Sequence, residues 1–282
     1  MLIARTLAEL RTHCTTLRER FGSLALVPTM GALHEGHMAL VRAAGAHGGG
    51  VVASIFVNPL QFAPTEDLSR YPRDEAGDLA QLERNFCHLA WLPDVATMYP
   101  PDDATTINVE GPALHWEGDA RPGHFRGVAT VCARLFGQVR PDRAYFGEKD
   151  WQQLQVVGRM VADLLLPLEI VGVPTVREPD GLAMSSRNRF LGAGERVTAA
   201  RLFATLSATA RQLAASRGSN GRAAAGVLAA GRTALRDAGF AVDYFALVDG
   251  ATLLPLEAAR PQARLVAAAR LGSVRLIDNI AV

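Results

Sequence analysis

The sequence contains almost no lysine. Of its 29 lysine and arginine side chains 28 are arginine, and Lys149 is the single lysine. An ammonium is a compact point charge, whereas a guanidinium is a bulky planar fork, so arginine does not replace lysine at a crowded oxyanion. Phosphate sites commonly use lysine as that point charge. Two interpretations follow: Lys149 is the survivor of a GC-rich codon bias, or it lines an anion site.

Cysteine, net charge and long apolar runs are also scarce. Three cysteines without paired spacing argue against a disulfide framework and fit free thiols in a reducing cytoplasm. A formal net charge of +1 gives no electrostatic footprint for nucleic acid. The most apolar stretch, residues 160–176, is interrupted by charges and prolines, so we expect no membrane span. Thr6-x-x-Glu9 reads as a capping box opening an amphipathic helix, and not as a signal peptide.

What the sequence does contain is enough apolar material for a core. Hydrophobic residues make up 49% of 282 residues, which predicts one large domain or two smaller ones. Up to residue 176, strand-like and helix-like segments alternate. The strand-like segments are 24–27, 51–57, 88–92, 144–146 and 168–173; the helix-like segments are 38–46, 74–85, 128–139 and 151–165. Such alternation predicts an α/β, Rossmann-like parallel sheet with helices on both faces and ligands at the carboxyl ends of its strands.

The pattern changes beyond residue 176. Residues 175–184 read as a hairpin around a turn, and Ala- and Arg-rich helices follow, with a loop at Gly218-Ser-Asn-Gly221. Three strands are predicted at 242–248, 264–269 and 274–280. We therefore expect two domains: 1–176, and a smaller α+β domain over 177–282.

The most distinctive segment runs from Leu24 to Met38. An apolar strand ends at Pro28, a loop with glycines follows, and His34 and His37 enter the first turn of a helix. Residues three apart share a helix face, and free N–H groups and the helix dipole make a helix start an anion site. Since His34, Asn58 and Lys149 each follow a strand, we expect them to converge on one crevice.

Other interpretations of the two histidines remain. A zinc site would need further ligands, and no cysteine or third ligand is suitably spaced. The histidines could be ordinary capping or core residues. A dinucleotide-binding loop would require Gly-x-Gly-x-x-Gly, which residues 29–36 do not supply. A phosphate-directed pair is the preferred hypothesis.

The segment also resembles a known family. His34-Glu35-Gly36-His37 is similar to the His-x-Gly-His signature of the nucleotidyltransferase superfamily, and Pro28-Thr-Met-Gly-Ala-Leu-His-x-Gly-His37 resembles the pantothenate synthetase (pantoate–β-alanine ligase) family. The agreement extends along nearly the whole chain. Further matching segments are Phe56-Val-Asn-Pro-Leu-Gln-Phe62, Gly123-His-Phe-Arg-Gly127, Arg140-Pro-Asp-Arg143, Phe146-Gly-Glu-Lys-Asp150, Met184-Ser-Ser-Arg-Asn188 and Leu276-Ile-Asp-Asn279.

The resemblance implies an ATP-dependent ligase with Mg²⁺. Pantoate would attack ATP to give pantoyl adenylate and pyrophosphate, and β-alanine would then displace AMP to give pantothenate. A cytoplasmic homodimer is implied, with no nucleic acid or membrane partner.

The resemblance also implies site residues. The catalytic set would be His34, His37, Lys149, Ser185, Ser186 and Arg187. The ATP set would be Met30, Gly31, Ala32, Leu33, His34, Glu35, Gly36, His37, Gly147, Glu148, Lys149, Asp150, Val176, Met184, Ser185, Ser186 and Arg187. Gln61 and Gln153 would hold pantoate, Gln61 also β-alanine, and no protein metal site is expected beyond Asp150 at most.

Several residues also have an ordinary structural interpretation. Residues 184–188 could be an ordinary polar loop, although their hydroxyls and guanidinium suit a triphosphate. Cys132 could line the pocket without acting as a nucleophile. A solvated loop explains Asp67, Arg70, Tyr71 and Arg73, and structural roles explain His13, His47, His88 and His115.

Two other function classes remain open. One is an adenylyltransferase whose AMP-containing product is final, which the histidine motif permits. The other is a nucleotide- or metal-binding module without catalysis. An assay that detected free AMP would argue against the adenylyltransferase. Pyrophosphate release that depends on pantoate would exclude the binding module.

Overall fold

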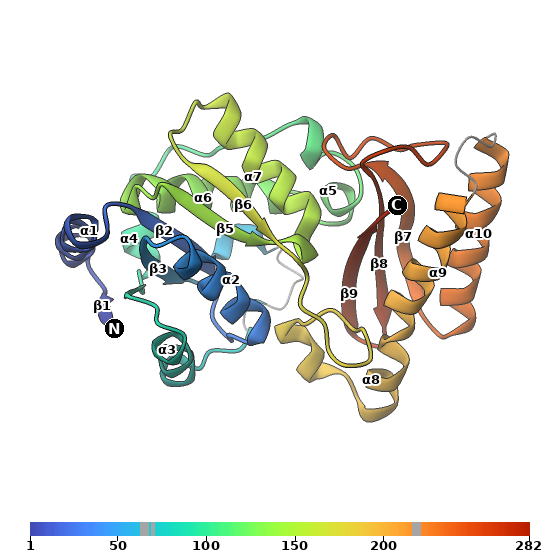
Figure 1. The fold of residues 1–282 in the computed structure, drawn as a ribbon, viewed down its shortest axis with the longest axis horizontal. Helices are drawn as coiled ribbons and strands as arrows, with labels where there is room; N and C mark the ends of the chain where they lie inside the picture. Colours follow the sequence, from blue (N-terminus) through green and yellow to red (C-terminus); the bar gives the residue numbers. More distant parts are fainter. Residues whose placement is uncertain (63–67, 69–70, 216–220) are drawn as a thin grey trace.

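A computed structural model shows two sheets side by side, each with its own helices (Figure 1). It describes residues 1–62, 68, 71–215 and 221–282. The larger sheet consists of β1 (Leu2–Ala4), β2 (Leu24–Thr29), β3 (Gly50–Ile55), β4 (Leu89–Trp91), β5 (Arg143–Gly147) and β6 (Glu169–Val173). All six strands are parallel, in the order β1-β4-β3-β2-β5-β6.

Helices cover both faces of this sheet. They are α1 (Leu7–Phe21), α2 (Glu35–Ala46), α3 (Glu75–Arg84), α6 (His124–Val139) and α7 (Trp151–Asp163). Apolar side chains of α1, α6 and α7 form a core on one face, and those of α2 and α3 form a core on the other. Successive residues of a strand point to opposite faces, so Leu26 joins the first core and Val27 the second. Burial on both faces explains the continuous apolar runs of these strands.

The strand order fixes where a ligand can bind. From β2 the chain moves to β3 and β4 on one side, and later to β5 and β6 on the other. The order therefore reverses between β2 and β5. In open parallel sheets the crevice at such a reversal, beyond the carboxyl ends of the strands, is the usual binding site. The segments that leave Thr29 and Gly147 meet there.

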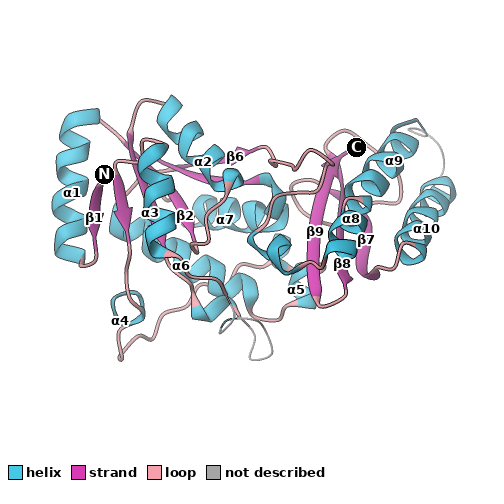
Figure 2. Ribbon diagram, turned by 90° about the horizontal axis from the view of Figure 1, so that it is seen from below, coloured by secondary structure: helices cyan, strands magenta, loops and turns pink. Residues whose placement is uncertain are grey.

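The smaller sheet is antiparallel and consists of β7 (Ala241–Asp249), β8 (Ala263–Leu271) and β9 (Val274–Ala281). Helices α9 (Arg201–Ala215) and α10 (Gly221–Asp237) cover its outer face, as Figure 2 shows, and α8 (Ala193–Ala199) lies at one end. The inner face packs Val248 and Val266 against Trp116 and Trp151 of the larger part. The α/β fold with a smaller α+β part is thus confirmed.

The elements differ from the predicted ones mainly at their ends. The helical pattern was read from 38, and α2 begins at Glu35 with His34 as its N-cap, so the two histidines do lie at its first turn; α6 begins at His124 and not at 128. Strand β1 and the short helices α4 (Val95–Met98) and α5 (Glu117–Ala120) were not predicted, because three or four residues are too few to show a period. The hairpin over 175–184 pairs through one bridge, Arg177 to Ala183. Residues 218–220 of the predicted loop lie outside the described residues.

Short 3-10 turns carry several polar segments. They are η1 (Pro59–Gln61), η3 (Gly111–Ala113), η4 (Glu148–Asp150) and η5 (Ser186–Phe190). Across the described ranges, no helix combines the length and apolarity that crossing a membrane requires.

Candidate functional site

A cavity of about 220 Å³ opens beyond the carboxyl ends of β2 and β5. His34, Asn58 and Lys149 all line it, which confirms the predicted convergence. Of the residues expected at the site, the cavity is lined by Met30, His34, Gly36, His37, Gln61, Gly147, Lys149, Asp150, Gln153, Val176, Met184, Ser185, Ser186 and Arg187. These residues come from four separate stretches of the chain, which the sheet reversal brings together.

Five residues expected around the nucleotide do not line this cavity: Gly31, Ala32, Leu33, Glu35 and Glu148. Ala32 and Leu33 are buried, and their backbone N–H groups donate to the Asp78 carboxylate at 2.9 and 2.7 Å. That carboxylate lies on α3 and is itself only 2% exposed. These two N–H groups therefore hold the loop in place.

The two acidic members of this group have partners elsewhere. Glu35 is exposed and forms an ion pair with Arg42 on the same helix. The Glu148 carboxylate lies 3.0 Å from a guanidinium nitrogen of Arg264 on β8. Both carboxylates are therefore paired with arginines. A carboxylate would repel a phosphate, so neither is suited to contact one.

His34 and His37 cap the start of α2 with their own rings. The backbone N–H of Gly36 donates to His34 Nδ1 at 3.1 Å, and that of His34 donates to His37 Nδ1 at 3.2 Å. The sequence predicted free backbone N–H groups at this helix start. In the structure the N–H groups of His34 and Gly36 are instead occupied by the two imidazoles. Because an N–H can only donate, both Nδ1 atoms must be acceptors, so each neutral ring carries its proton on Nε2.

Gly36 allows this arrangement by having no side chain. A Cβ at this position would lie 2.8 Å from His34 Cε1 and 2.9 Å from His34 Nδ1. The ring could not then remain over the helix start. The glycine of the motif is therefore required by the close approach of the neighbouring imidazole.

Both imidazoles are neutral at physiological pH. Burial, and then the positive charge of Lys149, lower the pKa of His34 to about 4. Burial, followed by His34 and Lys149, lowers the pKa of His37 to about 3. Two neutral Nε2–H donors and one ammonium thus line the same cavity. Fixed donors of this kind stabilise charge that develops on phosphate oxygens.

Gln61 is held by a buried hydrogen-bond chain. The Tyr99 hydroxyl donates to Asn58 Oδ1 at 2.7 Å, and Asn58 Nδ2 donates to Gln61 Oε1 at 3.1 Å. Gln61 Nε2 then faces the sulfur of Met30 at 3.0 Å. Asn58 Nδ2 also donates to the carbonyl of Gly127. The orientation of both amides is therefore fixed by the network, with the donor end of Gln61 toward Met30.

Gly127 lets helix α6 approach this segment. A Cβ there would lie 2.2 Å from the carbonyl oxygen of Leu60 and 2.7 Å from the backbone nitrogen of Gln61. Any larger residue would push η1 away from the cavity. This glycine belongs to the Gly123-His-Phe-Arg-Gly127 segment, so the motif serves the positioning of Gln61.

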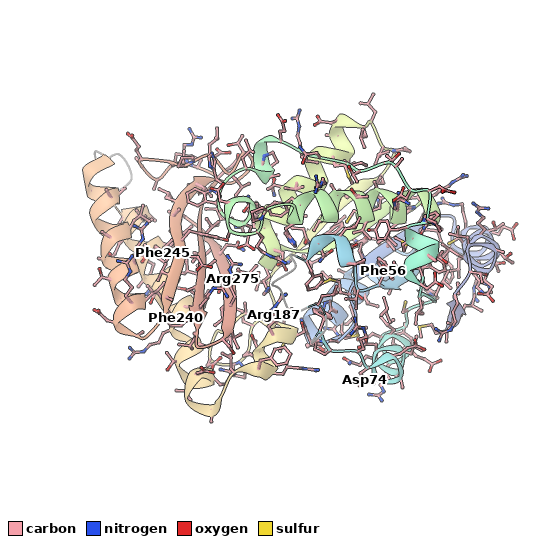
Figure 3. The ribbon with its side chains drawn as sticks, turned by 180° about the vertical axis from the view of Figure 1, so that it is seen from behind. Phe56, Asp74, Arg187, Phe240, Phe245 and Arg275 are labelled. Carbon is pink, nitrogen blue, oxygen red and sulfur yellow. The ribbon has the colours of Figure 1, made fainter. Side chains whose placement is uncertain are left out.

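Lys149 and residues 185–187 line the cavity from two separate segments of the chain. The Lys149 side chain is 19% exposed, and its Nζ lies 3.6 Å from Asp150 Oδ1. The backbone N–H of Arg187 donates to Ser185 Oγ at 3.3 Å, which fixes the turn that precedes η5. Arg187 and Arg275, both labelled in Figure 3, line one cleft at the junction of the two sheets. A second cleft of about 520 Å³ continues from Lys149 and Arg187 between the sheets.

Sequence reasoning gave no role to several cavity residues. His124 is buried, and its Nδ1 lies 2.9 Å from the carbonyl of Gln61. Arg121 also lines the cavity and donates to the same carbonyl at 3.3 Å. The sequence feature that could have indicated a role for His124 is the Gly123-His-Phe-Arg-Gly127 segment, which contains it. An apolar wall completes the cavity and consists of Phe56, Val128, Val131, Cys132, Leu135 and Phe146.

The remaining candidates lie as follows. Cys132 lines the cavity, and burial raises the pKa of its thiol to about 12, so it is not a nucleophile. Tyr71 also lines the cavity, and Arg73 donates to its carbonyl. Asp67 and Arg70 lie outside the described residues.

Two of the four histidines considered structural contact other elements of the fold through partly buried hydrogen bonds. His47 Nδ1 lies 2.8 Å from the Tyr145 hydroxyl, and His88 Nδ1 accepts from the backbone N–H of Val51. His115 pairs with Asp119 across 3.7 Å. None of these three residues, nor His13, lines the cavity.

The described residues were also compared with what a metal site needs. No group of three or more His, Cys, Asp or Glu side chains among them could hold a metal ion. The carboxylate of Asp150, which is half-exposed at the cavity, is an oxygen group of the kind that Mg²⁺ accepts.

Comparisons with known proteins identify the family and the fold. Residues 2–281 match the family model described as pantoate-beta-alanine ligase. Pantothenate synthetase from Granulibacter bethesdensis is 59% identical over 283 residues, which cover 99% of this chain and 96% of that protein. The crystal structure of pantothenate synthetase from Thermus thermophilus matches with a TM-score of 0.91 and 52% identity, covering 100% of this chain and 99% of the other.

A third relative carries ligands. It is the pantoate-beta-alanine ligase of Francisella tularensis, whose crystal structure is described as complexed with beta-gamma ATP and beta-alanine. It matches with a TM-score of 0.81 and 30% identity and covers 100% of this chain and 97% of the other. By the family match, the identities and the fold together, the chain belongs to the pantoate–β-alanine ligase family.

Proposed function

We propose that this chain joins pantoate to β-alanine at the expense of ATP, through a pantoyl adenylate. A carboxylate oxygen of pantoate attacks the α-phosphorus, and the bond from that phosphorus to the β-phosphate breaks, which releases pyrophosphate. The amine of β-alanine then attacks the acyl carbon. The bond from that carbon to the phosphate oxygen breaks, the amine loses a proton, and AMP and pantothenate leave.

The observation that carries this proposal is the composition of the cavity. Three donors to phosphate, His34, His37 and Lys149, share it with two glutamines and an apolar wall. The donors suit a nucleotide triphosphate, and the glutamines with the wall suit a small branched hydroxy acid. Since the imidazoles are neutral, they stabilise phosphate charge by donating from Nε2, and Lys149 supplies the full positive charge.

Gln61 and Gln153 bind pantoate. An amide can orient hydroxyls and a carboxylate without neutralising the carboxylate, which must remain a nucleophile. The Nε2 end of Gln61 faces Met30 and the cavity, so that it can donate to the acid. Gln61 also faces β-alanine in the second half-reaction. Positioning of two reactants in this way accounts for much of the acceleration expected.

Residues 185–187 cover the β- and γ-phosphates. The donors are the hydroxyls of Ser185 and Ser186 and the guanidinium of Arg187. The nucleotide contacts Met30, Val176 and the segments around His37 and Lys149.

We also propose a division into domains 1–176 and 177–282. The separate apolar cores of the two sheets support it. Because residues 185–187 belong to the second domain, that domain closes over ATP and excludes water from the adenylate.

Magnesium would accompany ATP in this proposal, with the carboxylate of Asp150 available to hold it. The ion would supply positive charge that neutralises the phosphates. The Asp150 side chain lines the cavity, is 44% exposed, and has its Oδ1 3.6 Å from Lys149 Nζ.

The family resemblance also supports a cytoplasmic homodimer that binds neither nucleic acid nor membrane. Free buried thiols at Cys14, Cys87 and Cys132 agree with a reducing compartment.

One experiment tests the chemistry. With pantoate and Mg-ATP but no β-alanine, the enzyme should release about one pyrophosphate per site in a burst, since the adenylate is held out of water. Addition of β-alanine should then release free AMP. Pyrophosphate that appears only with β-alanine would contradict the adenylate, and AMP retained in the product would favour an adenylyltransferase. Omission of pantoate is the control.

A further inference from the structure

A side chain of the smaller sheet contacts the backbone of the turn that carries Lys149. Asn279 lies on β9 and is 5% exposed. Its Nδ2 donates to the carbonyl oxygens of Glu148 and Lys149, both at 2.9 Å. The turn has no side-chain cap of its own at either Gly147 or Asp150. Asn279 does not replace such a cap, which would accept from N–H groups; it holds the turn instead by donating to two of its carbonyl oxygens.

Arg264 on β8 sets the direction of this amide. Its Nε donates to Asn279 Oδ1 at 2.6 Å, and its Nη2 donates to Glu148 Oε2 at 3.0 Å. Its guanidinium carbon lies 3.4 Å from the centre of the Trp151 ring. Arginine has donors only, so the amide oxygen must face it and the NH₂ must face the two carbonyls. The orientation is therefore determined by the neighbours.

The adjacent residue holds β9 in place. The Asp278 carboxylate is 2% exposed and accepts two hydrogen bonds from Arg177, at 2.7 and 3.0 Å. Arg177 belongs to the segment that leads to Ser185. One short piece of β9 consequently contacts both the turn of Lys149 and the segment before the serine loop.

We propose that Asn279 is a positioning residue for the reaction: through the carbonyls of Glu148 and Lys149 it holds the ammonium of Lys149 at the phosphate position. The inference rests on the proposed function, in which Lys149 stabilises the triphosphate. A misplacement of about 1 Å at a reacting group can lower a rate by about 10²-fold. The smaller sheet therefore orients a residue of the larger one, besides covering the nucleotide.

The first test is kinetic. Asn279→Ala should lower kcat for pantoate-dependent pyrophosphate release by about 10²-fold, with a much smaller change in KM for pantoate. Tyr244→Phe is the matched control, because it removes another contact between the sheets, the 2.9 Å bond from its hydroxyl to Glu117, without touching the turn. The control should keep the parent kcat. Parent kcat in Asn279→Ala, or an equal loss in Tyr244→Phe, would overturn the proposal.

If Asn279→Ala does not fold, Asn279→Asp is measured in its place. It keeps the shape and the contact with Arg264 but has no donor, so the same loss is expected. Parent kcat in this variant would likewise overturn the role.

The second test observes the lysine directly. Because Lys149 is the single lysine, ¹⁵N-lysine labelling gives one backbone amide signal. Without substrates, that signal should move in the Asn279 variants and stay in Tyr244→Phe. An unmoved signal beside a reduced kcat would mean that Asn279 acts in another way. Failure of the proposed function would instead appear in the unsubstituted enzyme, as no pantoate-dependent pyrophosphate at all.

Discussion

His37 Nδ1 accepts a hydrogen bond from the backbone N–H of His34 at 3.2 Å, and the two rings lie 4.1 Å apart. The motif is thus a helix cap and a donor pair at once. The cap occupies Nδ1 in each ring, so that the proton is kept on Nε2. A residue that preserved the cap but lacked Nε2–H would separate the two roles.

His37→Asn is such a change, since asparagine Oδ1 can replace Nδ1 as the acceptor for the His34 N–H. Both His37→Ala and His37→Asn should lower single-turnover adenylation by about 10²–10³, the usual loss for one oxyanion donor. Only His37→Ala should also lose stability, by about 0.5–2 kcal/mol, because it removes the half of the capping box in which the His37 ring accepts from the N-cap N–H of His34. His13→Ala on α1 is the control. Unchanged adenylation in His37→Asn would remove the imidazole from the mechanism.

Stability should fall in mild acid because of the same two rings. Their pKa values are lowered from an ordinary 6.5 to about 4 for His34 and about 3 for His37. Between these values the unfolded chain binds more protons, so stability is complete above pH 6.5 and is lost as the pH falls toward 4 and 3. Melting temperatures from pH 7 downward should show this decline. In His37→Asn the decline should be shallower, and parallel curves would contradict the assignment.

The periodicity of the chain predicted the larger sheet well. Its strands are apolar because both faces are buried, and the helices between them show a clear period. The rule that ligands bind at strand carboxyl ends then grouped His34, Asn58 and Lys149 correctly, although they are far apart in the sequence. The motif of the histidines gave the family.

Contacts between distant segments could not be predicted. Asp78 on α3 accepts from the backbone N–H groups of Ala32 and Leu33 in the loop before α2. These two N–H groups seemed open to a ligand but are occupied. Asn279 reaches the Lys149 turn from the other end of the chain. Each contact depends on how two distant elements are placed relative to one another. Sequence periodicity reports on single elements and does not reveal that placement.

The buried ion pair between the sheets allows a prediction about stability. Glu117 on α5 accepts from Arg275 Nη1 at 2.9 Å and Nη2 at 2.6 Å, and its side chain is 8% exposed. Burial alone would raise the pKa of Glu117, but the hydrogen bonds and charge of Arg275 lower it below its ordinary value. Arg275→Ala should therefore cost roughly 3–5 kcal/mol, because the buried carboxylate loses its bidentate partner and keeps the weaker contacts with the Tyr244 hydroxyl at 2.9 Å and with Arg121 at 3.9 Å.

Urea unfolding measures this loss. The control is Arg270→Ala, whose side chain is 54% exposed and 3.9 Å from Asp243, and which should cost about 0–1 kcal/mol. Equal losses in the two variants would mean that the Glu117 pair is no stronger than a surface contact.

The single lysine allows chemical modification to be assigned without ambiguity. An amine reagent can reach Lys149 and the N-terminal amine, which lies 3.3 Å from Glu83, a residue that does not line the cavity. If Lys149 contacts the triphosphate, Mg-ATP should protect it while the N-terminus still reacts. Intact mass and peptide mapping distinguish the two sites, and the N-terminus is the internal control.

Lys149→Arg should keep charge and fold yet lose most adenylation. The ammonium lies 3.6 Å from Asp150 Oδ1 and acts as a compact point charge, a position that a bulky planar guanidinium does not reproduce. Lys149→Ala should be no more active, having lost the charge as well. Arg143→Lys, at an exposed ion pair with Glu169, is the converse control and should be fully active. Near-normal turnover in Lys149→Arg would mean that Lys149 survives only through codon bias.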